Sequence, residues 1–452
     1  MSVPYILFII ISTVLLLFFF IIKLKINAFI SLLVVSIYVG ILAGMPLEAV
    51  LQSIEKGMGS TLGFVAVIVG LGAIFGQMLE VSGGAESLAD YMIGKFGKEK
   101  SSWAMMITGF IIAIPVFLDV GFIILVPIVY ALSRDAKKPV LYYGIPLLAG
   151  LAVTHSFIPP TPGPVAVADI LGASLGWVIL FGFLLGIPTA IIAGPVFGRF
   201  ISKKIPVIPD HELYSDANVK AEIKDKPSFS GIVSLIFIPL LLMVLRTVFQ
   251  MMIRNDAVSA NVITQIVIFI GHPFSALIIA TILSIYILGI RRGINKKEIL
   301  QLSSKALGPA GIIILITGAG GVLKQILVDS GIGEIIAESV VGSSFSPILL
   351  AWILAAIVRI TQGSATVAMI TAAGFIAPIL DILALSEIHT ALVVLAIASG
   401  ATILSHVNDS GFWLVGKYLG LNEKQTLQSW TVMETIISLC GLALCLTTSI
   451  IL

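Results

Sequence analysis

Ionisable side chains are rare in the long apolar stretches of this chain, and the few that occur there mark candidate sites. Asp119 lies in the segment IPVFLDVGF, where Pro115 removes a helix donor and Gly121 permits a turn. A carboxylate at membrane depth costs about 2.5–3.5 kcal/mol on insertion scales, so we expect Asp119 to have a function. The structural alternative is an ion pair or a helix cap.

A second candidate is the segment RITQGSATVAM, which begins at Arg359. Gly363, Ser364 and Thr366 are predicted to open a half-helix, whose free amides and positive dipole end suit an anionic group. Arg359 adds a fork of donors that matches a carboxylate. The alternative for Arg359 is pairing with an internal acid such as Asp119.

Histidines precede two further breaks at matching places in the chain. The segment THSFIPPTPGP contains His155 and has four prolines and a glycine within six residues, which forbids a regular helix. The segment SHVNDSGFW carries His406, Asn408 and Asp409. Histidine titrates near neutral pH, so His155 and His406 are candidate proton carriers, with structural hydrogen bonding as the alternative.

The composition shows what surrounds these groups. Of 452 residues, 58% are hydrophobic and 11% are charged, and the mean hydropathy is +1.13. A soluble domain carries roughly a quarter charged residues, so the bilayer is the expected solvent. The net charge of +2 gives no basic field for nucleic acid.

Spanning-length apolar stretches predict an all-α polytopic membrane protein with about ten crossing helices. These stretches are 4–22, 26–44, 61–80, 140–158, 175–197, 230–253, 261–289, 307–328, 390–407 and 429–452. Two further stretches, 103–133 and 346–380, are too long for one crossing and are interrupted by polar and helix-breaking residues. Backbone breaks at membrane depth survive only inside protein or beside a wet cavity, so these stretches point to the site.

Loop charges orient the predicted helices, because basic residues favour the cytoplasmic side. Basic loops at 95–100 and 134–138 flank the first broken stretch, which is therefore predicted to enter and leave the membrane from inside as a re-entrant hairpin. The loops at 329–338 and 381–389 lack Lys and Arg, so the second hairpin is expected to enter from outside.

The two halves of the chain also resemble each other. GLGAIFGQMLEVSGGAESLA from Gly70 and GAGGVLKQILVDSGIGEIIA from Gly318 share eight of twenty positions. The loop charges give these copies opposite directions, which predicts inverted-topology repeats as in secondary transporters. The predicted division is 1–198, a cytoplasmic linker at 199–228, and 229–452. The glycine-rich start of each copy is expected to allow close helix packing.

On these residues the chain resembles the gluconate permease family, the gluconate:proton symporters of the ion transporter superfamily. The segments that carry the resemblance are KGMGSTLGF, GLGAIFGQMLEVSGGAESLA, IPVFLDVGFIILVPI, PPTPGPVA, TGAGGV, QGSATVAM, SHVNDSGFWLV and KYLGL. They cover the chain nearly end to end. The signature segments contain Asp119, Gly363, Ser364, Thr366, Asn408 and Asp409.

The resemblance implies uptake of an aldonate such as gluconate with a proton through the bacterial inner membrane. It also implies a homodimer with a static scaffold and a moving transport unit built around the two hairpins. Many members read PPHPGP where this chain has Thr161, so Thr161 is a candidate substrate contact at which the ligand or the coupling differs. D-serine, glycerate and lactate are alternative substrates.

The predicted mechanism needs no cofactor or metal. Hairpin amides with Ser364 and Thr366 hold the carboxylate, with Arg359 as a candidate partner, while Asn408 and Asp409 bond the hydroxyls. Proton binding at Asp119, a histidine or Asp409 lets the loaded site cross. A channel and an intramembrane enzyme built on Asp119 and His155 are the rival interpretations; no nucleophile and base pair is evident for the enzyme.

Overall fold

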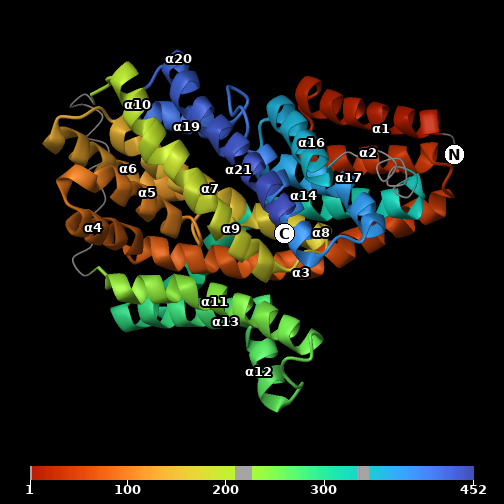
Figure 1. Ribbon diagram of the computed structural model, residues 1–452, viewed down its shortest axis with the longest axis horizontal. Helices are drawn as coiled ribbons and strands as arrows, with labels where there is room; N and C mark the ends of the chain where they lie inside the picture. Colours follow the sequence, from red (N-terminus) through yellow and green to blue (C-terminus); the bar gives the residue numbers. More distant parts are fainter. Residues whose placement is uncertain (1–2, 209–225, 333–334, 336–345) are drawn as a thin grey trace.

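The computed structural model describes residues 3–208, 226–332, 335 and 346–452, and its regular structure there is helical throughout (Figure 1). The first half contains α1 (Val3–Phe18), α2 (Ala28–Leu42), α3 (Leu47–Val81), α4 (Gly84–Phe96), α5 (Ser101–Ile112), α6 (Leu118–Ala136), α7 (Leu141–Phe157), α8 (Pro162–Ile170), α9 (Leu175–Ile191) and α10 (Phe197–Lys204). The second contains α11 (Phe229–Arg254), α12 (Val262–Ile270), α13 (Pro273–Ser284), α14 (Lys296–Asp329), α16 (Pro347–Gln362), α17 (Ala365–Leu383), α18 (Glu387–Gly400), α19 (Ser410–Tyr418), α20 (Glu423–Thr426) and α21 (Val432–Ile451).

Eight helical runs in the described part of the chain are long and apolar enough to cross a membrane. They are Pro4–Ile21, Leu47–Val81, Leu141–Ile170, Leu175–Lys204, Phe229–Arg254, Pro273–Arg292, Lys296–Asp329 and Glu423–Ile451. Two of the ten predicted spans, 26–44 and 390–407, form the shorter helices α2 and α18. The chain is thus an all-α polytopic membrane protein, with fewer full-length spans than the apolar stretches predict.

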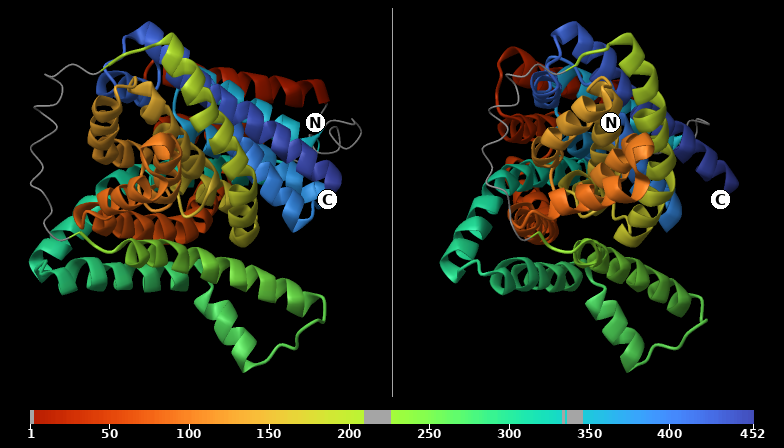
Figure 2. Two further views of the ribbon diagram at one scale, coloured as in Figure 1. Left: turned by 60° about the vertical axis from the view of Figure 1, so that its left-hand side comes forward. Right: turned by 90° about the vertical axis from the view of Figure 1, so that its left-hand side faces the viewer.

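The predicted span 261–289 is wrong as a single helix, because it breaks between α12 and α13. Pro273 has no amide to continue the helix, and the His272 ring caps the new one by accepting from the Phe274 amide at 3.3 Å. A Cβ on Gly271 would lie 2.4 Å from the Leu242 carbonyl of α11. α12 consequently projects away from the paired helices α11 and α13 (Figure 2).

The predicted boundary at residue 198 lies inside a helix. A π-helical segment, Ile192–Val196, joins α9 to α10, so the helical run continues to Lys204 and includes the first residues of the predicted linker. Residues 209–225 of that linker, and 333–334 and 336–338 of the predicted outer loop, lie outside the described residues.

α3 and α14 form the most extensive helix pair in the described part of the chain and pack antiparallel. Ser53 donates to the Asp329 carboxylate at 2.7 Å near one end. Further along, Gly57 lies against Gly321, and Gly70 lies against Leu307. Small residues let the backbones approach closely, as predicted. Each of these helices carries one copy of the repeated segment, and an antiparallel pair is the arrangement that inverted copies require. The inverted repeat itself stays a prediction.

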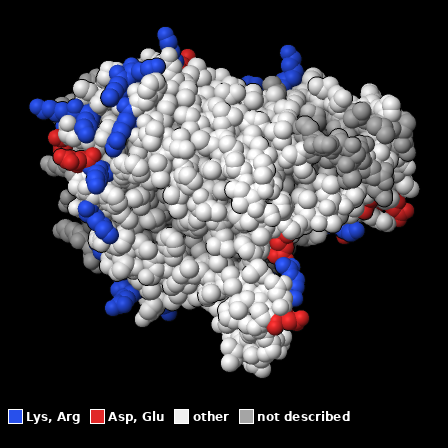
Figure 3. Space-filling model, in the orientation of Figure 1, with Lys and Arg blue, Asp and Glu red and all other residues white. Residues whose placement is uncertain are grey.

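The loops predicted to be cytoplasmic gather at one end of the molecule. The Val140 amide donates to the Val207 carbonyl at 2.9 Å, and Lys226 forms a 2.6 Å ion pair with Asp90 of α4. Lys and Arg side chains cluster at this end, where α4, α5 and α10 lie (Figure 3). At another site Arg254 pairs with Glu387 at 2.6 Å, next to the second hairpin's outer end. The basic loops therefore lie together at one end, and the side of the membrane that this end faces stays a prediction.

Candidate substrate site

The first broken stretch is a helix pair, α5 and α6, joined at residues 113–117. α5 has 12 residues and a length of about 18 Å, which is too short to cross the hydrocarbon. The turn packs against α3, since a Cβ on Gly76 would lie 2.2 Å from the Pro115 carbonyl. The predicted hairpin is therefore present, and its tip lies inside the protein.

Asp119 lies at this tip, in the first turn of α6, with an exposed side chain. Its charge acts on His155, near the C-terminus of α7. The His155 ring lies edge-on to Phe117 with centroids 6.2 Å apart, and among the described residues its Nδ1 has no hydrogen-bond partner. The structure thus brings these two predicted proton carriers together.

Thr161 lies in the break between α7 and α8, facing the same hairpin. Its hydroxyl donates to the Ile158 carbonyl at 2.6 Å, and its side chain is buried. A small pocket is lined by Thr161, Pro115 and Gly72 of α3. The Thr161 hydroxyl therefore stabilises the turn of the backbone between α7 and α8.

The second broken stretch is the pair α16 and α17, which turns at Gly363. Gly363 has φ +91°, and a Cβ there would lie 2.3 Å from the Asn408 carbonyl. Ser364 caps α17 by accepting from the Val367 amide at 3.3 Å. Thr366 is half-buried in the first turn. This geometry confirms that a helix begins at this break, although with 19 residues α17 is longer than the predicted half-helix, and it explains why glycine stands at the turn.

Asn408 and His406 lie beside this turn in the break between α18 and α19. The Asn408 side chain donates to the Ile360 carbonyl at 3.0 Å, and its oxygen contacts the His406 Nδ1. Asn408 is exposed and His406 is half-buried. The second-half candidates therefore form one group around the hairpin tip.

Arg359 pairs with Asp409 at 2.6 Å, so the predicted alternative of an internal acid as its partner holds, and that acid is Asp409 and not Asp119. The guanidinium also donates to the Gly363 carbonyl. Asp409 accepts from the Ser405 hydroxyl and from the Gly411 amide, the latter at 3.0 Å. Arg359 lies one turn before its own hairpin tip, so it reaches the loop that packs there and not the other hairpin.

Glu434 is a site residue that we did not predict. Its side chain is 4% exposed on α21, and the charges of Arg359 and Asp409 act on it. One turn earlier, Trp430 donates to the Ser405 hydroxyl at 2.6 Å. The sequence contains a signal for this residue, because Glu434 is the single charged residue in the apolar run 429–452.

The two groups of candidates meet where α8 packs against α17. A Cβ on Gly163, two residues after Thr161, would lie 2.6 Å from the Met369 sulfur. Met369 follows Ser364 by just over one helical turn. Breaks from both halves of the chain therefore flank one region.

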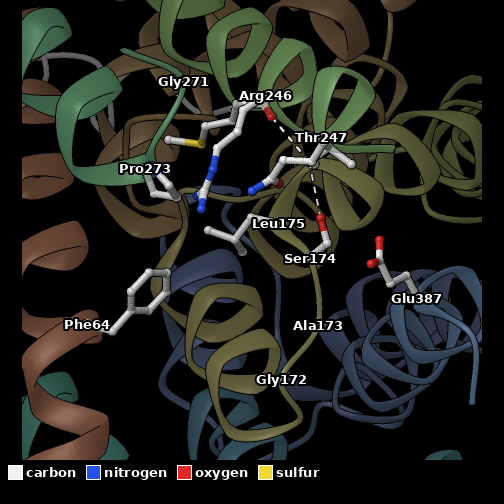
Figure 4. Close-up of a pocket in the computed structure, with 13 residues that line it drawn as sticks. Phe64, Gly172, Ala173, Ser174, Leu175, Arg246, Thr247, Gly271, Pro273 and Glu387 are labelled. Atoms are coloured by element: carbon white, nitrogen blue, oxygen red, sulfur yellow. Dashed lines mark hydrogen bonds between the residues drawn. The ribbon is translucent and has the colours of Figure 1, made fainter. Parts of the chain in front are cut away.

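A larger cavity than the one at Thr161 lies elsewhere. It has a volume of about 250 Å³ and is lined by Phe64, Arg246 and Glu387, among others. Arg246 points into it, while Ser174 and Thr247 are hydrogen bonded at its wall, 3.1 Å apart (Figure 4). Glu387 begins α18, whose 14 residues separate it from the Asn408 loop by about 20 Å. None of the predicted site residues lines this cavity.

In each half of the chain, helices are interrupted inside the molecule, and ionisable groups lie at the interruptions. This arrangement is typical of a multi-pass membrane transporter. The fold resembles that of the Alcanivorax borkumensis YdaH transporter, with a TM-score of 0.58 over 88% of each chain at 13% identity. Residues 5–451 match the model of the GntP family permeases. The chain belongs to this family, and it is a permease of the bacterial cell membrane and not an enzyme.

Characterised relatives cover nearly the whole chain. The gluconate permease of Bacillus subtilis is 42% identical over 97% of this chain and 98% of its own. In Escherichia coli K12, the high-affinity gluconate transporter is 41% identical and the Gnt-II system L-idonate transporter is 40% identical, each over 96% of this chain and 97% of its own.

Proposed function

We propose that this permease takes up an aldonate, gluconate or a close relative such as L-idonate, together with a proton. Relatives named for gluconate and for L-idonate are equally similar to this chain within two percentage points of identity. Both substrates combine one carboxylate with a row of hydroxyls. The proposal is therefore for this chemical class.

The observation that carries the proposal is the free N-terminus of α17 at the second hairpin tip. Ser364 caps the Val367 amide. The amides of Ala365 and Thr366 come in the first turn of α17, where there is no earlier helical turn to accept from them. They form the positive end of the helix dipole, which favours an anion. We place the substrate carboxylate there, with the Thr366 hydroxyl as a further donor.

Asn408 is our candidate for the sugar hydroxyls. It is exposed beside the tip and uses one amide hydrogen for the Ile360 carbonyl, which leaves its second amide hydrogen for a ligand. Asp409 is already bonded by Arg359, Ser405 and Gly411. We therefore assign Asp409 and Arg359 to positioning the tip.

Symport requires only that substrate and proton stabilise the same state, a coupling worth typically about 1–3 kcal/mol. The charge of Asp119 acts on His155 at the first tip, and α8 packs against both α7 and α17. A charge change at either break is therefore transmitted to the other through packed helices. Thr161 bonds its own loop, so we expect it to shape that break.

Uptake of labelled gluconate into proteoliposomes tests the proposal. We expect saturable accumulation driven by an inward proton gradient, abolished by a protonophore and strongly reduced in Asp119→Asn. L-idonate should compete well, whereas D-serine, glycerate and lactate should compete poorly. Equal uptake without a gradient would contradict symport, and non-saturating flux would indicate a channel.

The homodimer is part of the same proposal. It is supported by the family resemblance and by the outward apolar face of α12, where Val262, Ile263 and Phe269 are each more than 70% exposed. Native mass spectrometry should give twice the mass of the chain. A monomer under conditions that preserve transport would contradict it.

A further inference from the structure

Three ionisable side chains from three separate elements form a buried cluster behind the second hairpin tip. Arg359 comes from α16, Asp409 from the N-terminus of α19, and Glu434 from α21. Arg359 is 3% exposed and Glu434 is 4% exposed. The Asp409 side chain is 13% exposed, so the cluster is largely buried but not closed to water.

The charges in this cluster do not balance. It holds two carboxyl groups and one guanidinium, so it carries a net negative charge when both carboxyls are ionised. Burying an uncompensated charge is unfavourable, and interacting carboxyls then share a proton. Neutrality requires that one of the two acids holds a proton.

The hydrogen bonds distinguish the two acids. Asp409 accepts from Arg359, Ser405 and Gly411. Glu434 has no partner for Oε1 among the described residues. Glu434 is therefore the candidate for the acid that holds the proton.

The helices packed against α21 carry few other charges. Of the helices packed against α21, α9 carries no ionisable side chain, α16 carries Arg359 alone, and α18 carries Glu387 and His389 in its first turn only. α7 carries His155 near its far end, and Arg359 and Asp409 are the charges that act on Glu434.

Glu434 is also held in place. Trp430 donates to Ser405 at 2.6 Å on one side, and Ser438 accepts from Trp352 of α16 at 3.0 Å on the other. Positions 430, 434 and 438 lie on one helix face. These bonds fix this face of α21 beside Ser405 and α16.

The Arg359 guanidinium has one donor that is not used. Arg359 Nε has no partner among the described residues, while its other nitrogens bond Asp409 and the Gly363 carbonyl. When Glu434 loses its proton to water, the carboxylate competes for Arg359. That competition loosens the hold of Arg359 on Gly363, immediately before the cap of α17.

We propose that Glu434 is a second proton-binding residue of symport, in addition to the Asp119 and His155 pair of the first tip, and that it acts on the substrate site through Arg359 and Gly363. This inference rests on the proposed function. When Glu434 is protonated, Arg359 stays bonded to the Gly363 carbonyl, and the hairpin tip is ordered for substrate. When Glu434 releases its proton toward the cytoplasm, that bond weakens and the tip loses this order.

Glu434→Gln tests the inference in proteoliposomes. We expect proton-driven gluconate accumulation to fall at least tenfold, while gluconate counterflow falls far less, because exchange needs no net proton movement. Glu434→Asp should restore accumulation with a shifted pH profile. The exposed Glu423→Gln is the control and should behave as wild type. Wild-type accumulation in Glu434→Gln would overturn the proposal.

Infrared spectroscopy separates this inference from the proposed function. A protonated carboxyl band in the ligand-free wild type at neutral pH should be absent from Glu434→Gln and shifted in Glu434→Asp. An unchanged band in both variants would overturn the inference even if gluconate is transported. Absence of gluconate transport by wild type would refute the proposed function, and the band would still report on Glu434.

Discussion

At the scale of single residues, the site depends on close contacts that few side chains tolerate. Gly363 combines a left-handed backbone with direct contact to Asn408, and Arg359 combines deep burial with a bond to the same turn. Both residues act through the shape of the hairpin tip. Substitutions there should affect stability and transport together.

Gly363→Ala should destabilise the protein and abolish uptake. The left-handed conformation alone costs a non-glycine residue about 1–2 kcal/mol, and the new Cβ would also clash with the Asn408 carbonyl, 2.3 Å away. Thermal unfolding in detergent and proteoliposome uptake measure the two effects. Gly44→Ala is the matched control, since Gly44 has φ +77° with nothing within 4 Å of its Cβ. Equal losses in both variants would show that the contact is unimportant.

Arg359→Gln should lower stability by about 3–5 kcal/mol, because it leaves Asp409 buried without its counter-charge. The double variant Arg359→Gln with Asp409→Asn should regain much of that stability and still fail to transport. Thermal shift and uptake assays distinguish the outcomes. Full transport by the double variant would disprove a positioning role for the pair.

At the scale of elements, the antiparallel pair α3 and α14 positions both hairpins. Gly76 of α3 lies under the first tip at Pro115, and Gly320 of α14 lies against Ile370 of α17. Because glycine has no side chain, each hairpin can approach α3 or α14 closely at these positions. The repeated glycines therefore set distances between helices.

Gly321→Ala should force α3 and α14 apart and lower the melting temperature. Its Cβ would lie 2.1 Å from the Thr61 hydroxyl and 2.7 Å from the Gly57 carbonyl. Gly311→Ala on the same helix meets nothing within 4 Å and should gain up to about 1 kcal/mol from helix propensity. Thermal unfolding of the two variants gives the comparison. A stabilising Gly321→Ala would contradict the packing described for this pair.

At the scale of the whole molecule, the distribution of charge matches the arrangement of loops. Basic side chains gather at one end (Figure 3), and Glu387, which pairs with Arg254, belongs to the loop 381–389 that the sequence predicts on the other side. A bilayer with basic loops inside orients the molecule accordingly.

Cysteine labelling in intact cells tests this orientation. In a variant with Cys440 and Cys445 replaced, Lys137→Cys should react with an impermeant thiol reagent only after permeabilisation. Ser259→Cys should react from outside. Both positions are exposed. Reaction of both from one side would contradict the predicted sidedness.

Much of the architecture is readable from the sequence because local chemistry dictates it. Apolar length predicts membrane crossing, and prolines and glycines predict the breaks at residues 113–117, 158–161 and 363–364 that the structure shows. Gly363, Ser364 and Asn408 were predicted to belong together and do. Helix lengths were less predictable, because α3 and α14 continue beyond their apolar cores into polar residues.

Only the tertiary structure decided which charged groups are partners. Arg359 and Asp409 are 50 residues apart, and either could pair with any acid or base that folding brought near. Whether Glu434 faces lipid, a neighbouring helix or the ion pair depends on the rotation of α21 about its axis. That rotation follows from packing against α16 and α18, since an almost uniformly apolar helix specifies no face by its own periodicity.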